Sequence, residues 1–333
     1  MAKDIVVGVD LGGTSLLAVA TNAKGKILGE SKRKTLPEEG AGAVLERMVK
    51  GIQEAVHGAD LKMKDVCAVG IGVPGPLNPK TGVVFHLPNL GPTWNNLPIV
   101  TLLSKRLGRP VYIANDVGVG AVGEHAFGVG HGYQNLVALF VGTGIGGGVV
   151  LRGKLYRGSR YTAGELGHSI LLADGPLCSC GRHGCAEALA SRTAIEREIR
   201  AAIAAGRDSV IPSLLQSTNQ DTMSSSIIGA ALEQGDLLTQ EVMARAEYYM
   251  GLLVANVVNI LDPQVVVLGG GLVERLGRSY VEPVRETAER YYLNQQDKDK
   301  VQIVETKLKG YAGALGAATL AYRSWRRGQK RHS

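Results

Sequence analysis

Two stretches that share one pattern decide the fold: residues 5–28 (IVVGVDLGGTSLLAVATNAKGKIL) and residues 136–155 (LVALFVGTGIGGGVVLRGKL). Each begins with a short apolar run, passes through a glycine-rich turn into a second run, and reaches a third after a turn with Gly and Lys. Short apolar runs separated by tight turns predict consecutive antiparallel strands. Because the pattern occurs twice, we expect a duplicated α/β architecture.

The rest of the chain alternates predicted helices and strands. Apolar residues recur at helical spacing in 40–57, 98–107, 186–205 and 239–261, and short apolar runs predict strands at 66–73, 111–114 and 265–268. A length of 333 residues favours two domains. We place them at 1–117 and 118–310, and expect a last helix, about 311–325, that could pack back on the first.

Bulk composition indicates a soluble globular protein, with 45% hydrophobic and 20% charged residues. No apolar run approaches the ~18 residues of a membrane span, and Met1–Asp4 leads directly into a strand without a signal peptide. We therefore expect a cytoplasmic protein. Many of the 45 glycines fall in short clusters after apolar runs, which predict tight turns or backbone that approaches a ligand.

The net charge of +7 is concentrated at the C-terminus, where residues 323–331 hold five basic residues and no acid. Such a tail can bind nucleic acid or a membrane surface, or it can be a solvated, frayed end. We favour the frayed end and expect neither nucleic-acid nor membrane binding.

The first glycine-rich turn, Gly12-Gly13-Thr14, follows Asp10. Its backbone N–H groups and the Thr14 hydroxyl could bind phosphate oxygens, and Asp10 could hold a magnesium ion through water. The alternative is an ordinary hairpin, in which Asp and Gly supply only turn chemistry.

The second turn, Gly142–Gly148, includes Thr143 and Gly144 and matches the spacing of a dinucleotide fingerprint. That fingerprint must open a helix, whereas residues 149–155 here predict a hairpin, so a phosphate loop between strands fits better. Neither turn has the Gly-Lys-Ser/Thr of a P-loop. A third cluster, Gly269, Gly270 and Gly271, follows a strand, where either a flat nucleoside or tight helix packing would explain it.

The spacing Cys178-x-Cys180-x4-Cys185 predicts a metal site. Cys67 lies too far away in sequence to be a probable fourth ligand, so His168 would complete a closed set of three Cys and one His, typical of structural zinc. His183 is the alternative ligand, although it would have to bend back to the same ion. A closed set leaves no position for the water of a catalytic zinc.

Acidic residues flank the predicted metal site and end a predicted strand. Glu165 and Glu187 would be fixed by the metal and could bind neighbouring sugar hydroxyls, unless both face solvent. Asp116 follows the strand at 111–114, where a carboxylate could take a proton from an attacking hydroxyl, with Asn115 beside it. The alternative is that these two residues cap a helix.

Together these motifs resemble the ROK family of sugar kinases and repressors, in the superfamily that includes actin and hexokinase. The resemblance rests on VGTGIGGGVVLRGKLYRGSRYTAGELGH at 141–168 and CSCGRHGCAE at 178–187, and it extends over nearly the whole chain. It implies duplicated actin-like (ribonuclease H-like) domains with an active-site cleft between them. The zinc-binding insertion would then lie at 164–187.

The resemblance also implies residue roles. Asp116 would be the catalytic base, and Mg²⁺ would accompany ATP. The sugar would contact Asn89, Asn115, Asp116, Glu165, His168 and Glu187. The phosphates would lie at Gly12, Gly13, Thr14, Gly142, Thr143 and Gly144, and the adenosine near Gly269, Gly270 and Gly271. Zinc would be bound by His168, Cys178, Cys180 and Cys185.

Two positions depart from the family pattern. Ser15 stands where many members have Lys, which could alter phosphate contacts or nucleotide preference. Ala114 replaces the Glu of the usual Glu-Asn-Asp, while Asp116 itself is retained.

The implied activity is phosphorylation of a hexose by ATP, first of all a glucokinase that phosphorylates the 6-hydroxyl of glucose. N-acetylmannosamine and N-acetylglucosamine kinases are the main alternatives; allose and fructose kinases are further rivals, of which fructose ranks lower. A sugar-sensing regulator without catalysis is a more distant alternative, and a repressor would be expected to have a DNA-binding domain before residue 5. The resemblance implies a homodimer or homotetramer.

Overall fold

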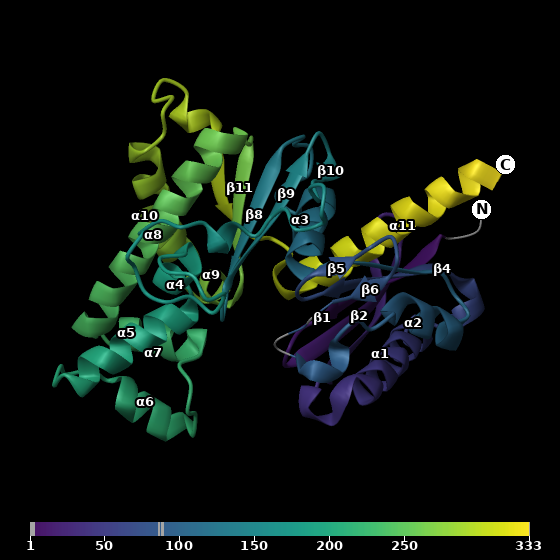
Figure 1. Ribbon diagram of the computed structural model, residues 1–333, viewed down its shortest axis with the longest axis horizontal. Helices are drawn as coiled ribbons and strands as arrows, with labels where there is room; N and C mark the ends of the chain where they lie inside the picture. The colour runs from purple at the N-terminus through teal and green to yellow at the C-terminus, as the bar shows by residue number, and fades with distance from the viewer. Residues whose placement is uncertain (1–3, 86, 88–89, 333) are drawn as a thin grey trace. The chain divides into compact units, whose positions relative to one another are not determined.

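The computed structural model describes residues 4–85, 87 and 90–332, so Asn89 lies outside the described residues. The chain forms two compact units. Unit 1 holds Met1–Gly132, Gly148–Gly164 and Gly310–Ser333, and unit 2 holds Tyr133–Gly147 and Glu165–Lys309. Figure 1 traces both units along the chain.

The sheet of unit 1 has the strand order β3-β2-β1-β4-β7. Strand β1 pairs antiparallel with β2 and parallel with β4, and β4 pairs parallel with β7. The predicted antiparallel hairpin at the N-terminus is therefore confirmed. The bounds are β1 Ile5–Leu11, β2 Ser15–Asn22, β3 Ile27–Lys34, β4 Val66–Val73 and β7 Val111–Asn115.

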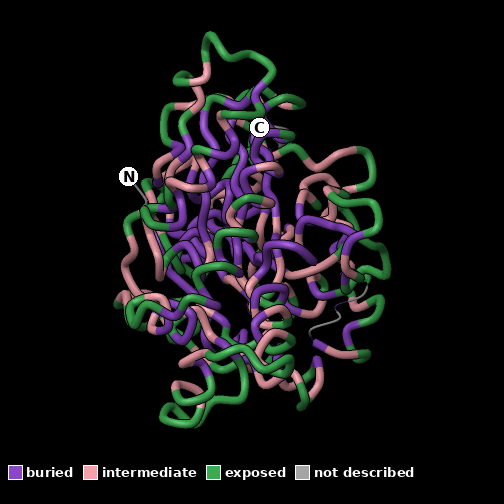
Figure 2. Tube along the Cα trace, turned by 90° about the vertical axis from the view of Figure 1, so that its left-hand side faces the viewer, coloured by how far each residue is buried: buried purple, intermediate pink, exposed green. Residues whose placement is uncertain are grey.

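Helices cover both faces of this sheet. On one face, α1 (Gly40–His57) and α2 (Ile99–Leu107) bury the side chains of Val7 and Val9 of β1. Successive side chains of a strand point to opposite faces of the sheet. On that opposite face, α3 (Asp116–Phe127) and α11 (Ala312–His332) bury Val6 and Ala114. Figure 2 shows the buried residues gathered in the interior of the trace.

Glycines bring α11 unusually close to the sheet. A Cβ on Gly8 would overlap the carbonyl oxygen of Ala314, and a Cβ on Gly70 would overlap that of Ala317. These single glycines within strands lie outside the clusters for which turns or ligand contacts were expected. Here the missing side chain lets a helix backbone lie directly on the strand backbone.

The basic C-terminal segment is part of this helix, because α11 extends to His332. The interpretation of residues 323–331 as a frayed end is therefore wrong. Helical geometry brings residues three and four apart onto one face, so four of the basic residues gather along one side of α11.

The second sheet repeats the arrangement of the first, with the order β10-β9-β8-β11-β12. Strands β9 and β10 pair antiparallel, whereas β11 pairs parallel with both β8 and β12. The predicted duplicated α/β fold is confirmed. The bounds are β8 Leu136–Val141, β9 Ile145–Leu151, β10 Lys154–Leu155, β11 Val265–Gly269 and β12 Gln302–Glu305. Two further strands, β5 (Leu77–Asn78) and β6 (Val83–Val84), pair with each other outside both five-stranded sheets.

The helix predicted over 186–205 is two helices, α4 (Ala186–Ala190) and α5 (Arg192–Ala204). Ser191 between them is extended, and its hydroxyl oxygen accepts the N–H of Ala194 at 3.1 Å as the N-cap of α5. The other helices of unit 2 are α6 Ile211–Thr218, α7 Ser225–Glu233, α8 Leu237–Leu261, α9 Gly271–Leu276 and α10 Arg278–Arg290.

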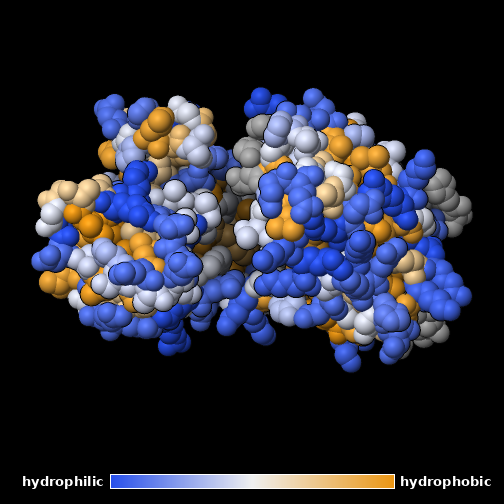
Figure 3. Space-filling view, turned by 90° about the horizontal axis from the view of Figure 1, so that it is seen from below, coloured by the Kyte–Doolittle hydropathy of each residue, from blue (hydrophilic) through white to orange (hydrophobic). Residues whose placement is uncertain are grey.

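Within the described part of the chain, no helix combines the length and apolar content needed to cross a membrane. Figure 3 shows hydrophilic and hydrophobic residues interspersed over the face it presents.

Candidate active site and metal centre

The turn between β1 and β2 is held from one side by Thr35. The N–H of Gly12 donates to the carbonyl oxygen of Ser15 at 3.0 Å. The Thr35 hydroxyl donates to the carbonyl oxygen of Gly12 at 2.7 Å, and the Thr35 N–H donates to that of Thr14 at 2.9 Å. Thr14 itself is exposed, so its hydroxyl lies at the solvent side of a braced turn.

Asp10, at the end of β1, has an unusual carboxyl group. Burial, together with the neighbouring charge of Asp116, raises the pKa of Asp10 from 3.8 to about 7. The two carboxylates are therefore close enough to interact within unit 1. A Cβ on Gly313 would overlap the Asp10 carboxylate, so the first turn of α11 also reaches this group.

Asp116 lies where β7 ends and α3 begins. Asn115 is the N-cap of α3, because its Oδ1 accepts the N–H of Gly118 at 3.0 Å. Asp116 is the first helical residue, and its Oδ1 accepts the N–H of Val117 at 2.9 Å. The capping alternative thus applies to Asn115, while the Asp116 carboxylate accepts a further N–H of the first turn.

The turn between β8 and β9 is fixed by the start of α5. The N–H of Gly142 donates to the carbonyl oxygen of Gly144 at 2.9 Å, and the N–H of Arg192 donates to that of Gly142 at 3.0 Å. The Arg192 guanidinium donates to Thr143 Oγ1 at 3.0 Å, and the Thr193 hydroxyl donates to the carbonyl oxygen of Thr143 at 2.8 Å.

Arg192 was not among the predicted site residues. It brings a cation to the predicted phosphate turn, and its side chain is largely buried. No local pattern marks it, because its partner Thr143 lies 49 residues earlier in the chain.

Glu187 connects this turn to the cysteine loop. Its Oε2 accepts the N–H of Ile145 at 3.0 Å, and its Oε1 accepts the Ser179 hydroxyl at 2.9 Å. The thiol of Cys178 lies 3.6 Å from the same Oε1. Glu187 is half-buried, whereas Glu165 is exposed, so the solvent-facing alternative describes only Glu165.

The predicted ligands gather at one point of unit 2. One ligand atom from each of His168, Cys178, Cys180 and Cys185 lies within 4.8 Å of all the others. His183 takes a different role, with its Nδ1 2.9 Å from the carbonyl oxygen of Gly175.

The spacing of these atoms fits zinc. Zinc held tetrahedrally, about 2.3 Å from sulfur and about 2.0–2.1 Å from nitrogen, would separate two sulfurs by about 3.8 Å and sulfur from nitrogen by about 3.6 Å. The Sγ atoms of Cys180 and Cys185 are 3.7 Å apart, and Cys178 Sγ is 3.6 Å from His168 Nδ1. The cluster is therefore compatible with a four-ligand zinc site.

The third glycine cluster lies where β11 ends and α9 begins. Gly270 has a φ of 87°, and a Cβ there would overlap the backbone of Val141. A Cβ on Gly269 would meet the ring of Phe140. Tight packing accounts for these two glycines, while a Cβ on Gly271 would meet only the Ser225 hydroxyl, at 3.3 Å.

The predicted residues divide between the two units. Asp10, the first turn, Asn115 and Asp116 lie in unit 1. Unit 2 holds Glu165, His168, Glu187, Cys178, Cys180, Cys185, Gly142, Thr143, Gly144, Gly269, Gly270 and Gly271. Asn89 lies outside the described residues.

A mixed sheet that occurs twice, with a glycine-rich turn between its first two strands, defines the duplicated α/β class that the resemblance to actin and hexokinase implied. Within this class the chain belongs to the ROK family, whose family model matches residues 6–324.

Both kinases and regulators are similar to this chain. A glucokinase of Thermotoga maritima is 36% identical over 320 residues, which cover 96% of this chain and 98% of that protein. A ROK family glucokinase from Streptomyces griseus, solved with glucose and AMPPNP, is 31% identical with a TM-score of 0.83, covering 96% of this chain and 99% of the other. A xylose repressor of Caldicellulosiruptor bescii is 31% identical, covering 96% of this chain and 78% of the repressor.

Proposed function

We propose that this chain is an ATP-dependent hexose kinase, and specifically a glucokinase that converts glucose and ATP to glucose 6-phosphate and ADP. The observation that carries the proposal is Asp116, a carboxylate at the end of a buried strand, in a helix whose N-cap is supplied by Asn115. The similarity to glucokinases over nearly the whole chain supports glucose as the acceptor.

In the proposed reaction, Asp116 takes the proton of the sugar 6-hydroxyl as its oxygen attacks the γ-phosphorus of ATP. A new P–O bond forms to the sugar, and the bond between the γ-phosphorus and the bridging oxygen breaks, leaving ADP. Asp10, whose carboxylate interacts with that of Asp116, would hold the Mg²⁺ that accompanies ATP. Magnesium would neutralise charge on the phosphate oxygens.

The two braced turns would bind phosphate. In the first, which comprises Gly12, Gly13 and Thr14, the N–H of Gly12 closes the turn, and the backbone of Gly13 and the exposed Thr14 hydroxyl would meet the phosphate oxygens. In the second, Gly142, Thr143 and Gly144 lie beside the Arg192 guanidinium, a suitable partner for phosphate oxygens. The adenosine would lie near Gly269, Gly270 and Gly271.

The sugar would be bound by Asn89, Asn115, Glu165, His168 and Glu187. We propose that zinc on His168, Cys178, Cys180 and Cys185 is structural, because four protein ligands complete a tetrahedral site. Its role would be to fix the loop from which Ser179 and Cys178 contact Glu187.

A coupled assay of ADP release over glucose, mannose, fructose, N-acetylglucosamine and N-acetylmannosamine tests the activity. We expect the highest kcat/KM with glucose. A higher value with an N-acetylhexosamine would assign the chain to the alternative kinases, and no turnover with any sugar would exclude a kinase.

A sugar-sensing regulator is the second candidate, and the similarity to a xylose repressor favours it. Calorimetry with glucose separates the two, because a regulator would bind the sugar without releasing ADP. We also propose a cytoplasmic homodimer or homotetramer, as the resemblance implies, which light scattering coupled to size-exclusion chromatography would test.

A further inference from the structure

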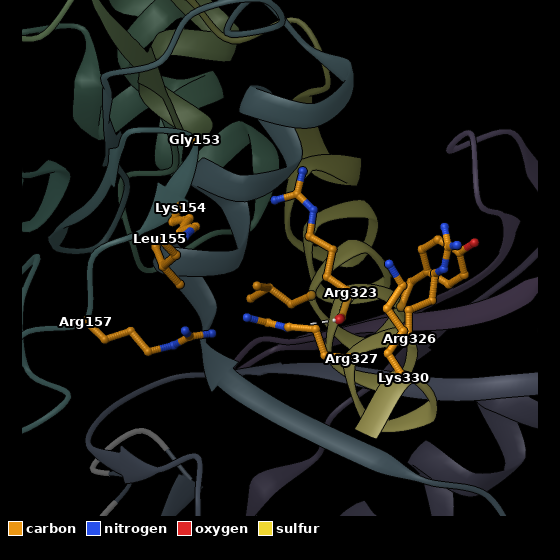
Figure 4. Close-up of a pocket in the computed structure, with 10 residues that line it drawn as sticks. Gly153, Lys154, Leu155, Arg157, Arg323, Arg326, Arg327 and Lys330 are labelled. Atoms are coloured by element: carbon orange, nitrogen blue, oxygen red, sulfur yellow. Dashed lines mark hydrogen bonds between the residues drawn. The ribbon is translucent and has the colours of Figure 1, made fainter. Parts of the chain in front are cut away.

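A cavity of about 570 Å³ in unit 1 is lined mainly by cations. It lies between the strand β10 with the residues that follow it and the last turns of α11 (Figure 4). Of its ten lining residues, six are basic and none is acidic. The basic residues are Lys154, Arg157, Arg323, Arg326, Arg327 and Lys330.

Within the part of the chain that the structure describes, these cations have no carboxylate partner. Among the described residues, none of the six forms a salt bridge, although most other arginines in helices do. Arg326 lies over the ring of Tyr322, 5.7 Å from its centroid, and the Asp4 carboxylate nearby accepts the Tyr322 hydroxyl. The Nε of Arg327 donates to the carbonyl oxygen of Arg323 at 3.1 Å.

The cations also repel each other. In Figure 4, Arg157 and Arg327 extend toward each other from opposite sides of the cavity. Burial lowers the pKa of Arg157 and of Arg323, and the charge of Arg327 lowers both further. Concentrating like charges in this way destabilises the empty site, and an anion between them would remove the repulsion.

The helix dipole does not explain the cluster. Cations in the last turn of a helix are stabilised by its carbonyl groups, and this applies to Lys330 at the end of α11. It does not apply to Arg157 and Lys154, which reach the same cavity from another part of the chain. Nor does it apply to Arg323, more than two turns before the helix end.

We propose that this cavity binds a small anion with two or more phosphate groups, at residues distinct from both glycine-rich turns. Guanidinium groups bind phosphate through paired, charge-assisted hydrogen bonds, and three or four of them match more than one phosphate. The side chains of Leu155 and Leu320 add apolar surface, which suits an organic phosphate such as a nucleotide. The volume is that of a small-molecule pocket.

Calorimetry on the full chain with inorganic tripolyphosphate tests the proposal, with saturating glucose and Mg²⁺–AMPPNP present to occupy the proposed active site. We expect one site with a dissociation constant below about 1 mM. Arg157→Gln/Arg327→Gln should weaken binding at least tenfold, whereas Lys24→Gln/Lys105→Gln, which removes two exposed charges elsewhere in unit 1, should leave it within about twofold.

A second variant keeps the proposal testable if the first variant does not fold. Arg323→Gln/Arg327→Gln changes two residues of α11 that line the cavity and belong to no hydrophobic core cluster, and it should also weaken binding at least tenfold. Undiminished binding by both folded variants, or no binding by the native chain, would overturn the proposal. Calorimetry measures binding and requires no turnover, so its result tests the anion site independently of the kinase assay.

Further titrations identify the source of the phosphates. Magnesium-free ADP tests an organic diphosphate, and pyrophosphate tests an inorganic one; binding of either that the variants weaken supports the site. A single-stranded oligonucleotide and anionic phospholipid vesicles test a larger partner. If either binds through the same basic residues and tripolyphosphate does not displace it, the residues form an extended basic surface, which would contradict a small-molecule pocket.

Discussion

The N–H of Ile145 donates to the Glu187 carboxylate at 3.0 Å, and this bond joins the second glycine-rich turn to the cysteine loop. The other oxygen of the same carboxylate accepts the Ser179 hydroxyl at 2.9 Å. A residue expected to bind sugar therefore also ties the predicted phosphate turn to the predicted zinc site. Carboxylates have capacity for further hydrogen bonds, so both roles are compatible.

Gly144→Ala should disrupt this connection, because a Cβ there would overlap the Glu187 carboxylate. We expect the free energy of unfolding to fall by about 1–3 kcal/mol, the usual cost of overpacking. Chemical denaturation followed by circular dichroism measures this change.

Gly142→Ala is the matched control, because a Cβ at that position would meet no heavy atom within 4 Å. Its effect on unfolding should be within about 0.5 kcal/mol. Equal destabilisation by both substitutions would show that backbone freedom of the turn, and not the space taken by Glu187, requires glycine at position 144.

Removal of one predicted metal ligand should release the metal. We expect Cys185→Ser to lose bound zinc and to melt at a lower temperature, because metal binding contributes directly to folding stability. Cys67→Ser changes a cysteine of unit 1 outside the cluster and should keep one zinc per chain. Elemental analysis of the purified variants checks both, and full zinc content in Cys185→Ser would contradict the assigned ligands.

Asp116→Asn should separate catalysis from folding. Asn115 supplies the helix cap, so the variant should fold normally, while kcat with glucose should fall by about 10²–10⁴ if Asp116 is the base. Asp208→Asn changes an exposed acid of unit 2 and should retain native kcat. A loss below about tenfold in folded Asp116→Asn protein would reject the proposed role.

Local sequence patterns predicted helices and strands correctly where the residues of one element determine its structure. The apolar periodicity at 40–57 predicted α1, and the run at 66–73 predicted β4, with the bounds that the structure has. The break at Ser191 was missed because the helical pattern continues through it, although Ser is a favoured N-cap. The cysteine spacing identified a cluster because its ligands are close in sequence.

Non-local relationships were not predictable in this way. Gly8 and Gly70 resemble ordinary strand positions until α11 packs on them from the far end of the chain. Glu187 and Ile145 are 42 residues apart, and no pattern near either indicates their hydrogen bond. Likewise Arg157 is far from α11 in sequence, and only the fold brings it to the cations of that helix.

Glu247 on α8 should make stability depend on pH. Burial raises the pKa of its carboxyl from 4.5 to about 8, and it interacts with the buried Tyr280 of α10. Between these two values the folded chain keeps a proton that the unfolded chain releases, so this group lowers stability as the pH rises from 4.5 to 8.

Glu247→Gln cannot ionise and should remove this dependence. At pH 8 we expect its free energy of unfolding to exceed that of the native chain by about 1–2 kcal/mol. This value is smaller than the full pKa shift would give, because the side chain is only half-buried and solvent screens its charge. At pH 5 the difference should be small, because Glu247 of the folded chain is then protonated and neutral. Glu286→Gln, at an exposed position of α10, should have little effect at either pH. Denaturant unfolding at both pH values decides the matter: a gain for Glu247→Gln that is equal at pH 5 and pH 8 would mean that packing, and not ionisation, makes the glutamate unfavourable.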